Sequence, residues 1–117
     1  MLEYIEKSFK NYIICGDLNS KNKAFGCKEN NKNGINLNNF ITNNNATILN
    51  NGEITFFRDY ANYTEALDLF ISSVSWYIEK FEVCTEIDLY SDHYPIKIEF
   101  FKNNNENEIR KNASFLE

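Results

Sequence analysis

A short apolar run at residues 12–15 (Tyr-Ile-Ile-Cys), closed by a glycine, restricts the fold of this chain more than any other feature. The run is too short for a helix of ordinary length, and it predicts a buried strand. Just before it, Leu2, Ile5 and Phe9 recur at helical spacing and predict a helix over residues 2–10. A chain that opens in this way mixes helix and strand and is not a helical bundle.

The rest of the chain supplies another helix and several short strands. Apolar periodicity and turn residues predict a helix near residues 35–44 and strands at residues 47–49, 54–57, 66–71, 76–83 and 96–100. The Asn51-Gly52 dipeptide predicts a turn that joins the first two of these strands. The alternation within residues 76–83 slips once, as a β-bulge would cause. These elements indicate an α+β fold.

Length and charge argue against several classes of protein. The chain has 117 residues, enough for one domain at most. Its net charge is −5 and its pI about 4.9, so it lacks the basic surface typical of proteins that grip nucleic acid through phosphates. No apolar run is long enough to span a bilayer, and the N-terminus does not resemble a signal peptide. Three cysteines without a Cys-x-x-Cys pair argue against a disulfide framework or a zinc cluster. We therefore expect an intracellular protein, nuclear or cytoplasmic, that is neither secreted nor bound to a membrane.

Three short polar stretches each adjoin a predicted strand. Asp17 and Asn19 follow the first strand, Asp68 lies inside an apolar strand, and Asp92 and His93 come just before the last strand. Each stretch also has an ordinary interpretation, because the first can be an Asx turn and the second can face water. A lone histidine is, likewise, more often a surface residue than a catalyst. Together and in this order, the three stretches point to a site.

Two predictions about geometry test this interpretation. We predict that Asp68 and His93 lie within hydrogen-bonding reach, about 2.6–3.2 Å, in the carboxylate–imidazole arrangement of many hydrolases. We also predict that Asp17, Asn19, Asp92 and His93 converge on one cleft, because each adjoins the end of a strand.

The three stretches resemble a known group of enzymes. Gly-Asp-Leu-Asn at residues 16–19, Leu-Asp-Leu at 67–69 and Ser-Asp-His-Tyr-Pro-Ile at 91–96 look like the C-terminal half of the endonuclease/exonuclease/phosphatase superfamily, which includes DNase I-like nucleases. Residues between them, such as 24–26 and 33–37, resemble the endonuclease domain that non-LTR retrotransposons encode ahead of a reverse transcriptase. The similarity covers roughly residues 2–100.

This resemblance implies part of a DNase I-like four-layer α/β/β/α sandwich, mainly one sheet with its flanking helices. Residues 1–101 would be the C-terminal half of the domain, and residues 102–117 a polar tail. The family's domain opens with strands that carry an Asn and a metal-binding Glu, and no residue here matches them. The missing N-terminal half would then be a partner of this chain. Phe25 stands where the retrotransposon group usually has Trp, and Asn33 where it often has Arg.

The implied reaction is metal-assisted hydrolysis of phosphodiester bonds in DNA, with Mg²⁺ or Mn²⁺ offsetting the charge that builds on the phosphate. Asp17 would orient or deprotonate the attacking water, and Asn19 would donate to the phosphate or the nucleophile. His93 would contact phosphate oxygens, with its tautomer fixed by Asp68.

The resemblance also implies a ligand set and a substrate surface. Asp92 and Asp17 would hold the metal ion. Thr55 and Phe56 would border the DNA groove, and a reverse transcriptase would follow the domain.

Two other functions stay open. The chain could be a non-catalytic remnant that only folds or binds a partner, or a phosphatase of the same superfamily that acts on phospholipid headgroups or inositol phosphates. The retrotransposon-like residues favour the nuclease over the phosphatase. Because the missing half would leave the apolar inner face of the sheet uncovered, we expect the isolated chain to be marginally stable. Because the metal-binding Glu is missing, we expect it to have little or no nuclease activity.

Overall fold

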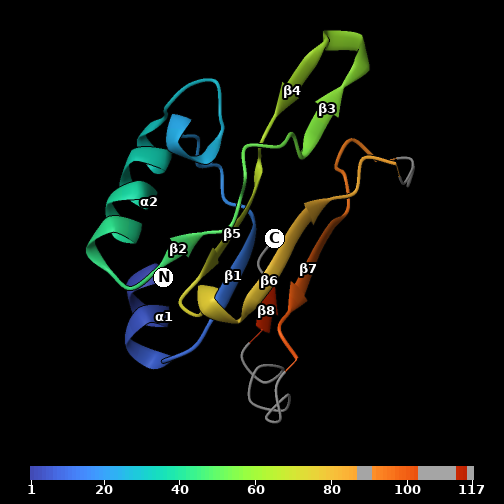
Figure 1. Cartoon of the computed structure of the whole chain (residues 1–117). Helices are drawn as coiled ribbons and strands as arrows, with labels where there is room; N and C mark the ends of the chain where they lie inside the picture. The colour runs from blue at the N-terminus through green and yellow to red at the C-terminus, as the bar shows by residue number, and fades with distance from the viewer. Residues whose placement is uncertain (87–90, 103–112, 116–117) are drawn as a thin grey trace.

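A four-stranded sheet lies at the centre of the structure (Figure 1). The computed structural model describes residues 1–86 and 91–102 and the backbone of residues 113–115. The helices are α1 (Leu2–Ser8) and α2 (Lys32–Asn43), and the strands are β1 (Ile13–Asp17), β2 (Thr47–Ile48), β3 (Phe56–Arg58), β4 (Tyr63–Glu65), β5 (Asp68–Ser72), β6 (Ile78–Val83), β7 (Ile96–Phe100) and β8 (Ala113–Phe115). The 3₁₀ turns η1 (Lys23–Phe25), η2 (Asp59–Ala61) and η3 (Ser75–Tyr77) lie between them. This mixture confirms the predicted α+β class.

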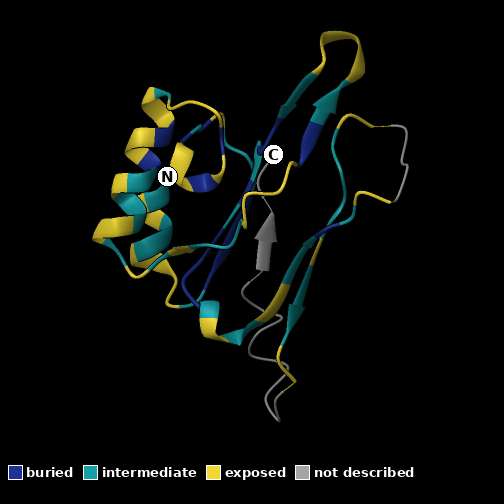
Figure 2. Ribbon diagram, turned by 45° about the horizontal axis from the view of Figure 1, so that its top comes forward, coloured by how far each residue is buried: buried dark blue, intermediate teal, exposed yellow. Residues whose placement is uncertain are grey.

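The strand predicted at residues 12–15 is β1, and it pairs antiparallel with β5. The sheet has the order β2-β5-β1-β8, and α1 and α2 cover one of its faces (Figure 2). Buried apolar side chains from β1, β5, η1 and α2 form the core on that face, chiefly Ile14, Leu69, Ile71, Phe25 and Leu37. Each such side chain contributes about 1.5–3 kcal/mol when fully buried. The sheet and the helices therefore form one well-supported unit.

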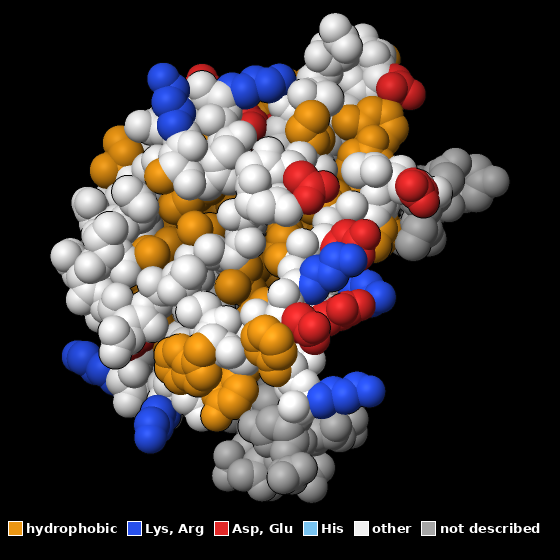
Figure 3. Space-filling view, viewed as in Figure 1, with side chains coloured by type: hydrophobic (Ala, Val, Ile, Leu, Met, Phe, Trp, Pro, Cys, Tyr) orange, Lys and Arg blue, Asp and Glu red, His pale blue; other side chains and the backbone are white. Residues whose placement is uncertain are grey.

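A hairpin of β6 and β7 lies against the other face of the sheet, where the ring of Phe81 meets that of Phe70 at a centroid distance of 5.6 Å. Lysine and glutamate residues alternate on its outward face, and Figure 3 shows charged side chains gathered over β6 and β7. The cross-strand pairs are Lys80 with Glu99 and Glu82 with Lys97. The register shifts between Ile78 and Lys80, which confirms the predicted bulge.

The hairpin predicted around Asn51-Gly52 is wrong. β2 pairs with β5, whereas β3 pairs with β4 in a separate two-stranded sheet. The cause is Asn50, whose side-chain Nδ2 donates to the Asp68 carbonyl at 2.8 Å and whose Oδ1 accepts from the Phe70 N–H at 2.9 Å. This amide takes the place of a further β2 residue on the edge of β5. The chain then turns away through Gly52, where φ is 90°.

The C-terminal stretch contributes to the sheet. β8 lies within residues 102–117, the predicted polar tail, and pairs in parallel with β1. Residues 103–112 and 116–117 lie outside the described residues. None of the described helices combines the length and the apolar character that crossing a membrane requires.

Candidate active site

Asp68 and His93 form a close pair. Nδ1 of His93 lies 2.7 Å from Oδ2 of Asp68, so the predicted distance is confirmed. Because a carboxylate only accepts hydrogen bonds, Nδ1–H is the donor and Nε2 is left for another partner. The Asp68 side chain is 17% exposed and the His93 side chain 42%. The imidazole is therefore accessible, while its carboxylate partner is largely shielded from water.

Asp68 is held in place by hydrogen bonds to its backbone N–H group and to its backbone carbonyl. The hydroxyl oxygen of Thr55 accepts from the N–H groups of Leu67 at 2.9 Å and Asp68 at 3.0 Å. On the other side, Asn50 donates to the Asp68 carbonyl, as described above. Thr55 is fully buried, so these hydrogen bonds are shielded from competition with water. The backbone of Asp68 at the start of β5 is therefore held rigidly, and this fixes the position of its carboxylate.

His93 is placed by a strand-like contact with β3. Residue 93 forms a β-bridge with Phe56, and the neighbouring Tyr94 N–H donates to the Thr55 carbonyl at 2.8 Å. The imidazole ring packs edge-on against the Phe56 ring at a centroid distance of 4.9 Å. Thr55 therefore binds the segments that carry both residues of the pair. Its hydroxyl accepts from the Asp68 N–H, and its carbonyl accepts from the Tyr94 N–H.

Asp17 lies beside this pair. In the β1–β5 ladder it stands directly opposite Asp68. Residues opposite each other in an antiparallel pair point to the same face, with Cβ atoms about 4.5–5.5 Å apart. Asp17 and Asp68 therefore lie on the same face of the sheet, and His93 is hydrogen-bonded to Asp68.

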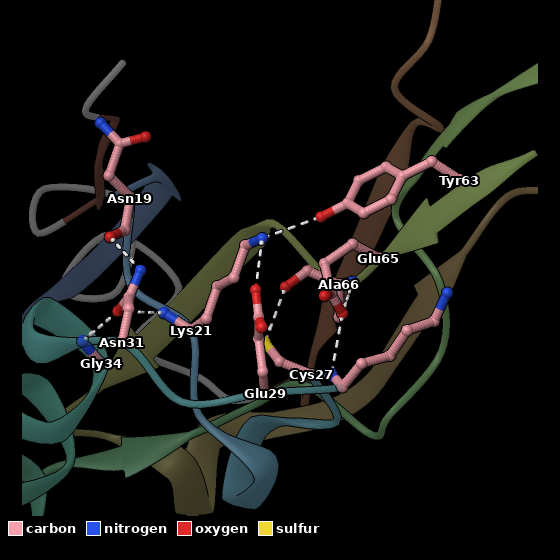
Figure 4. A network of polar contacts seen from close by, with 10 residues as sticks. Asn19, Lys21, Cys27, Glu29, Asn31, Gly34, Tyr63, Glu65 and Ala66 are labelled. Atoms are coloured by element: carbon pink, nitrogen blue, oxygen red, sulfur yellow. Dashed lines mark hydrogen bonds and ion pairs between the residues drawn. The ribbon is translucent and has the colours of Figure 1, made fainter. Parts of the chain in front are cut away.

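Asn19 and Asp17 also form the local turn that the ordinary interpretation expects. The Asn19 N–H donates to Oδ1 of Asp17 at 3.1 Å, and Asn19 has a positive φ of 51°. Its carbonyl accepts from Nδ2 of Asn31 at 3.1 Å. Figure 4 shows the Asn19 side chain directed away from Asn31, outside this network. An Asx turn therefore shapes the loop and leaves the amide of Asn19 exposed.

The loop after β1 is tied to Tyr63 of β4 (Figure 4). Asn31 caps α2 by accepting from the Gly34 N–H at 2.7 Å, and it also accepts from the Lys21 N–H at 2.9 Å. Nζ of Lys21 then donates to the Tyr63 hydroxyl at 2.9 Å and lies 3.6 Å from Glu29. The bond to Tyr63 is the main cause that raises the pKa of Lys21. These contacts fix the loop that carries Asn19.

Asp92 and the two predicted groove residues are placed differently. The Asp92 carbonyl accepts from the Phe57 N–H at 2.9 Å, and its exposed carboxylate lies 3.9 Å from Nε of Arg58. Thr55 and Phe56 are buried, so in this structure they support the Asp68–His93 pair instead of lining an open surface. Convergence of the Asn19 and Asp92 side chains on the same cleft stays a prediction.

Asp17 and Asp92 carry donor groups that suit a hard divalent cation. Among the residues that the structure describes, no three or more His, Cys, Asp or Glu side chains are grouped to hold a metal ion. Mg²⁺ is commonly bound by one or two carboxylates, with water and substrate phosphates completing its coordination. Asp17 and Asp92 supply carboxylates of this kind, so their chemistry fits such an ion.

Many hydrolases use an aspartate–histidine pair in their active sites. The family model described as endonuclease-reverse transcriptase matches residues 1–97, most of the chain. The chain therefore belongs to the endonuclease-reverse transcriptase family, which confirms the resemblance read from its motifs.

A solved structure shows the same fold. The endonuclease domain of TRAS1, a telomere-specific non-LTR retrotransposon, superposes with a TM-score of 0.69 and is 24% identical to this chain. The match covers 81% of this chain and 44% of the solved one, so this chain spans less than half of that domain's length. It is similar to a part of a DNase I-like endonuclease domain. No match was found among curated proteins.

Sequence reasoning missed two residues of this site. Asn50 holds Asp68 through a side-chain amide, and Arg58 faces Asp92. Asn50 lies in a run rich in asparagine, where no pattern separates it from its neighbours. Arg58 can be recognised as a site residue only when β3 is known to lie beside residues 92–94.

Proposed function

We propose that this chain hydrolyses phosphodiester bonds of DNA as part of the endonuclease of a retrotransposon reverse transcriptase. The observation that carries the proposal is the 2.7 Å hydrogen bond between His93 and Asp68, with Asp17 directly opposite Asp68 in the sheet. An accessible imidazole of fixed tautomer beside carboxylates is suited to proton transfer and to contact with a phosphate. Membership of the family supports the same reaction class.

Each residue has a role in this proposal. Nε2 of His93 faces a phosphate oxygen, and Asp68 holds the ring and its tautomer. Asp17 orients or deprotonates the attacking water. Asn19, whose exposed amide stands at the end of the same strand, donates to the phosphate or to the nucleophile. Thr55 and Phe56 position the pair from beneath the surface that meets DNA.

A divalent ion, Mg²⁺ or Mn²⁺, would be held by Asp17 and Asp92. When bound, such an ion neutralises charge that develops on the phosphate oxygens. Two protein carboxylates leave most positions to water and phosphate, and a carboxylate from the other part of an endonuclease domain would tighten binding. We therefore expect weak metal affinity and slow turnover for the 117-residue chain.

The competing function is a fragment that binds but does not cut. It is favoured because, among the described residues, no three or more His, Cys, Asp or Glu side chains are grouped to hold a metal ion. A nicking assay separates the two functions, because one cut relaxes a supercoiled plasmid and even slow turnover is visible.

The experiment incubates the purified chain with supercoiled plasmid in Mg²⁺ or Mn²⁺ and follows the relaxed form. We expect slow nicking that EDTA abolishes and that His93→Ala lowers by about 10²–10⁴-fold, the usual contribution of a general acid or base. Lys80→Gln, on the outward face of β6, serves as the matched control and keeps the wild-type rate.

Either of two results would overturn the proposal. Nicking that survives His93→Ala points to a contaminating nuclease. Absence of nicking over long incubation, by a chain shown to be folded by circular dichroism, favours the fragment that binds without cutting.

A further inference from the structure

The guanidinium of Arg58 is held in place, but one of its hydrogen-bond donors has no acceptor among the described residues. Its Nε atom is buried and has no hydrogen-bond partner among the described residues. The nearest acidic atom, Oδ2 of Asp92, lies 3.9 Å away, beyond hydrogen-bonding distance. Buried donors in native proteins almost always have a partner, so an unpaired one needs an explanation.

Two aromatic rings orient this guanidinium. Cζ of Arg58 lies 5.3 Å from the centre of the Phe56 ring and 5.5 Å from that of Tyr60. Stacking on aromatic rings keeps the planar group in one orientation and preserves its fork of donors for an anion. The side chain as a whole is 43% exposed, so part of that fork is open to solvent.

The same Phe56 ring also supports the imidazole of His93. Arg58 and His93 therefore share a supporting side chain, and Asp92 joins them as the sequence neighbour of one and the ion-pair partner of the other. This places a permanent positive charge beside the candidate active site of a chain whose net charge is −5.

We propose that Arg58 binds a backbone phosphate of duplex DNA next to His93. The identity of this ligand rests on the proposed function. A phosphate oxygen accepts from the guanidinium fork in the two-pronged geometry that arginine favours. Movement of the side chain toward that phosphate gives the Nε donor an acceptor that the unbound chain lacks.

The other explanation is a purely structural ion pair with Asp92. At 3.9 Å, with side chains 43% and 58% exposed, such a pair contributes little, because exposed pairs are typically worth about 0–1 kcal/mol. A structural pair also leaves the buried Nε donor unsatisfied. Phosphate binding accounts for the buried donor, the ring stacking and the exposure together.

The test measures binding without turnover. A fluorescent DNA duplex of about 20 base pairs is titrated with the chain in EDTA over a series of salt concentrations, because phosphate contacts make the affinity salt-dependent. The variants are Arg58→Gln, which removes the charge, and Arg58→Lys, which keeps it but lacks the fork. Lys80→Gln is the control, because it removes an equal charge from the outward face of β6.

We expect Arg58→Gln to weaken binding about tenfold, the equivalent of one charge-assisted hydrogen bond. The slope of log affinity against log salt should fall by about 0.9, the value for one lost phosphate contact. Arg58→Lys should keep the slope and lose part of the affinity. Lys80→Gln should change neither by a comparable amount.

Equal effects of Arg58→Gln and Lys80→Gln would overturn the inference, as would absence of DNA binding by the wild-type chain. Arg58→Lys keeps the test decisive if the Gln variant fails to fold. The outcome is independent of catalysis. Arg58-dependent binding without nicking would refute hydrolysis and leave this inference standing, whereas His93-dependent nicking with Arg58-independent binding would refute this inference alone.

Discussion

The two sides of the candidate site come from regions that are built differently. The sheet region, β1, β5, α2 and residues 18–31, buries its apolar side chains and binds its loop through many side-chain to backbone hydrogen bonds. The hairpin region, β3, β4 and residues 91–94, is buried at its base but carries Tyr60 at 85% exposure near its tip. Figure 1 shows this hairpin extending away from the sheet.

The two regions supply residues of two kinds to the candidate site. Asp17 and Asp68 belong to the sheet region, where burial fixes their positions. His93 and Arg58 belong to the hairpin region, where they remain accessible to a ligand. Changes in the sheet region should therefore cost stability, and changes at the hairpin should cost binding or catalysis while the fold persists.

Gly34→Ala should produce the largest loss of stability. In an open helix this substitution stabilises by about 1 kcal/mol. Here a Cβ atom on Gly34 would lie 1.7 Å from the backbone carbonyl oxygen of Lys21, which is held by the cross-bonded loop. We expect the free energy of unfolding to fall by about 3 kcal/mol or more, as in severe overpacking. Urea unfolding followed by circular dichroism measures it. Lys32→Ala, an exposed position at the start of α2, is the control and should change it by about 0.5 kcal/mol at most.

Thr55→Val should come next, and it acts at the junction of the two regions. The substitution keeps the shape of the side chain but removes the oxygen that accepts from the Leu67 and Asp68 N–H groups. A buried donor left without a partner costs about 1–3 kcal/mol, so we expect a loss of about 2–4 kcal/mol. Thr55→Ser keeps the oxygen and should lose about 1 kcal/mol for the missing methyl group. Equal losses for the two variants would show that packing, not the hydrogen bonds, holds Asp68.

Alkaline pH should weaken the sheet region by a smaller amount. Burial in the core, with a hydrogen bond from its hydroxyl to the Glu6 carboxylate, raises the pKa of Tyr12 above the ordinary 10.0. The folded chain then keeps this proton at a pH where the unfolded chain has lost it. Stability is therefore full below pH 10.0 and falls as the pH rises above it. The slope for one group is at most about 1.4 kcal/mol per pH unit. Tyr12→Phe should flatten the unfolding free energy against pH in this range, and an unchanged profile would contradict the assignment.

The sheet region was the easier of the two to predict from sequence. β1 and α2 follow from apolar patterns a few residues long, and such patterns arise from local burial. The Asp68–His93 pair was also predictable, because a carboxylate inside an apolar strand needs a polar partner and the chain has one histidine.

The hairpin region was predicted poorly because its structure depends on distant contacts. The Asn51-Gly52 signal for a hairpin is real as local chemistry, but the amide of Asn50 binds β5 and redirects the chain. Thr55 and Phe56 were expected at a surface, and their burial depends on residues 63–68 and 91–94 folding over them. Pairing between distant segments produces no hydrophobic periodicity in the sequence of either segment.

Tyr60→Ala should have the smallest effect on stability, and it separates DNA binding from folding. Tyr60 is 85% exposed, and its described ring contact is with Arg58. An exposed contact of this kind is worth about 0.5–1 kcal/mol, so the midpoint of urea unfolding should barely move. DNA binding should nevertheless weaken, because Arg58 loses one of the two rings that orient it. Tyr60→Phe keeps a ring in place and should bind DNA as the wild type does. A loss of stability as large as that of Thr55→Val would mean that the hairpin tip supports the fold, and the division between the two regions would fail.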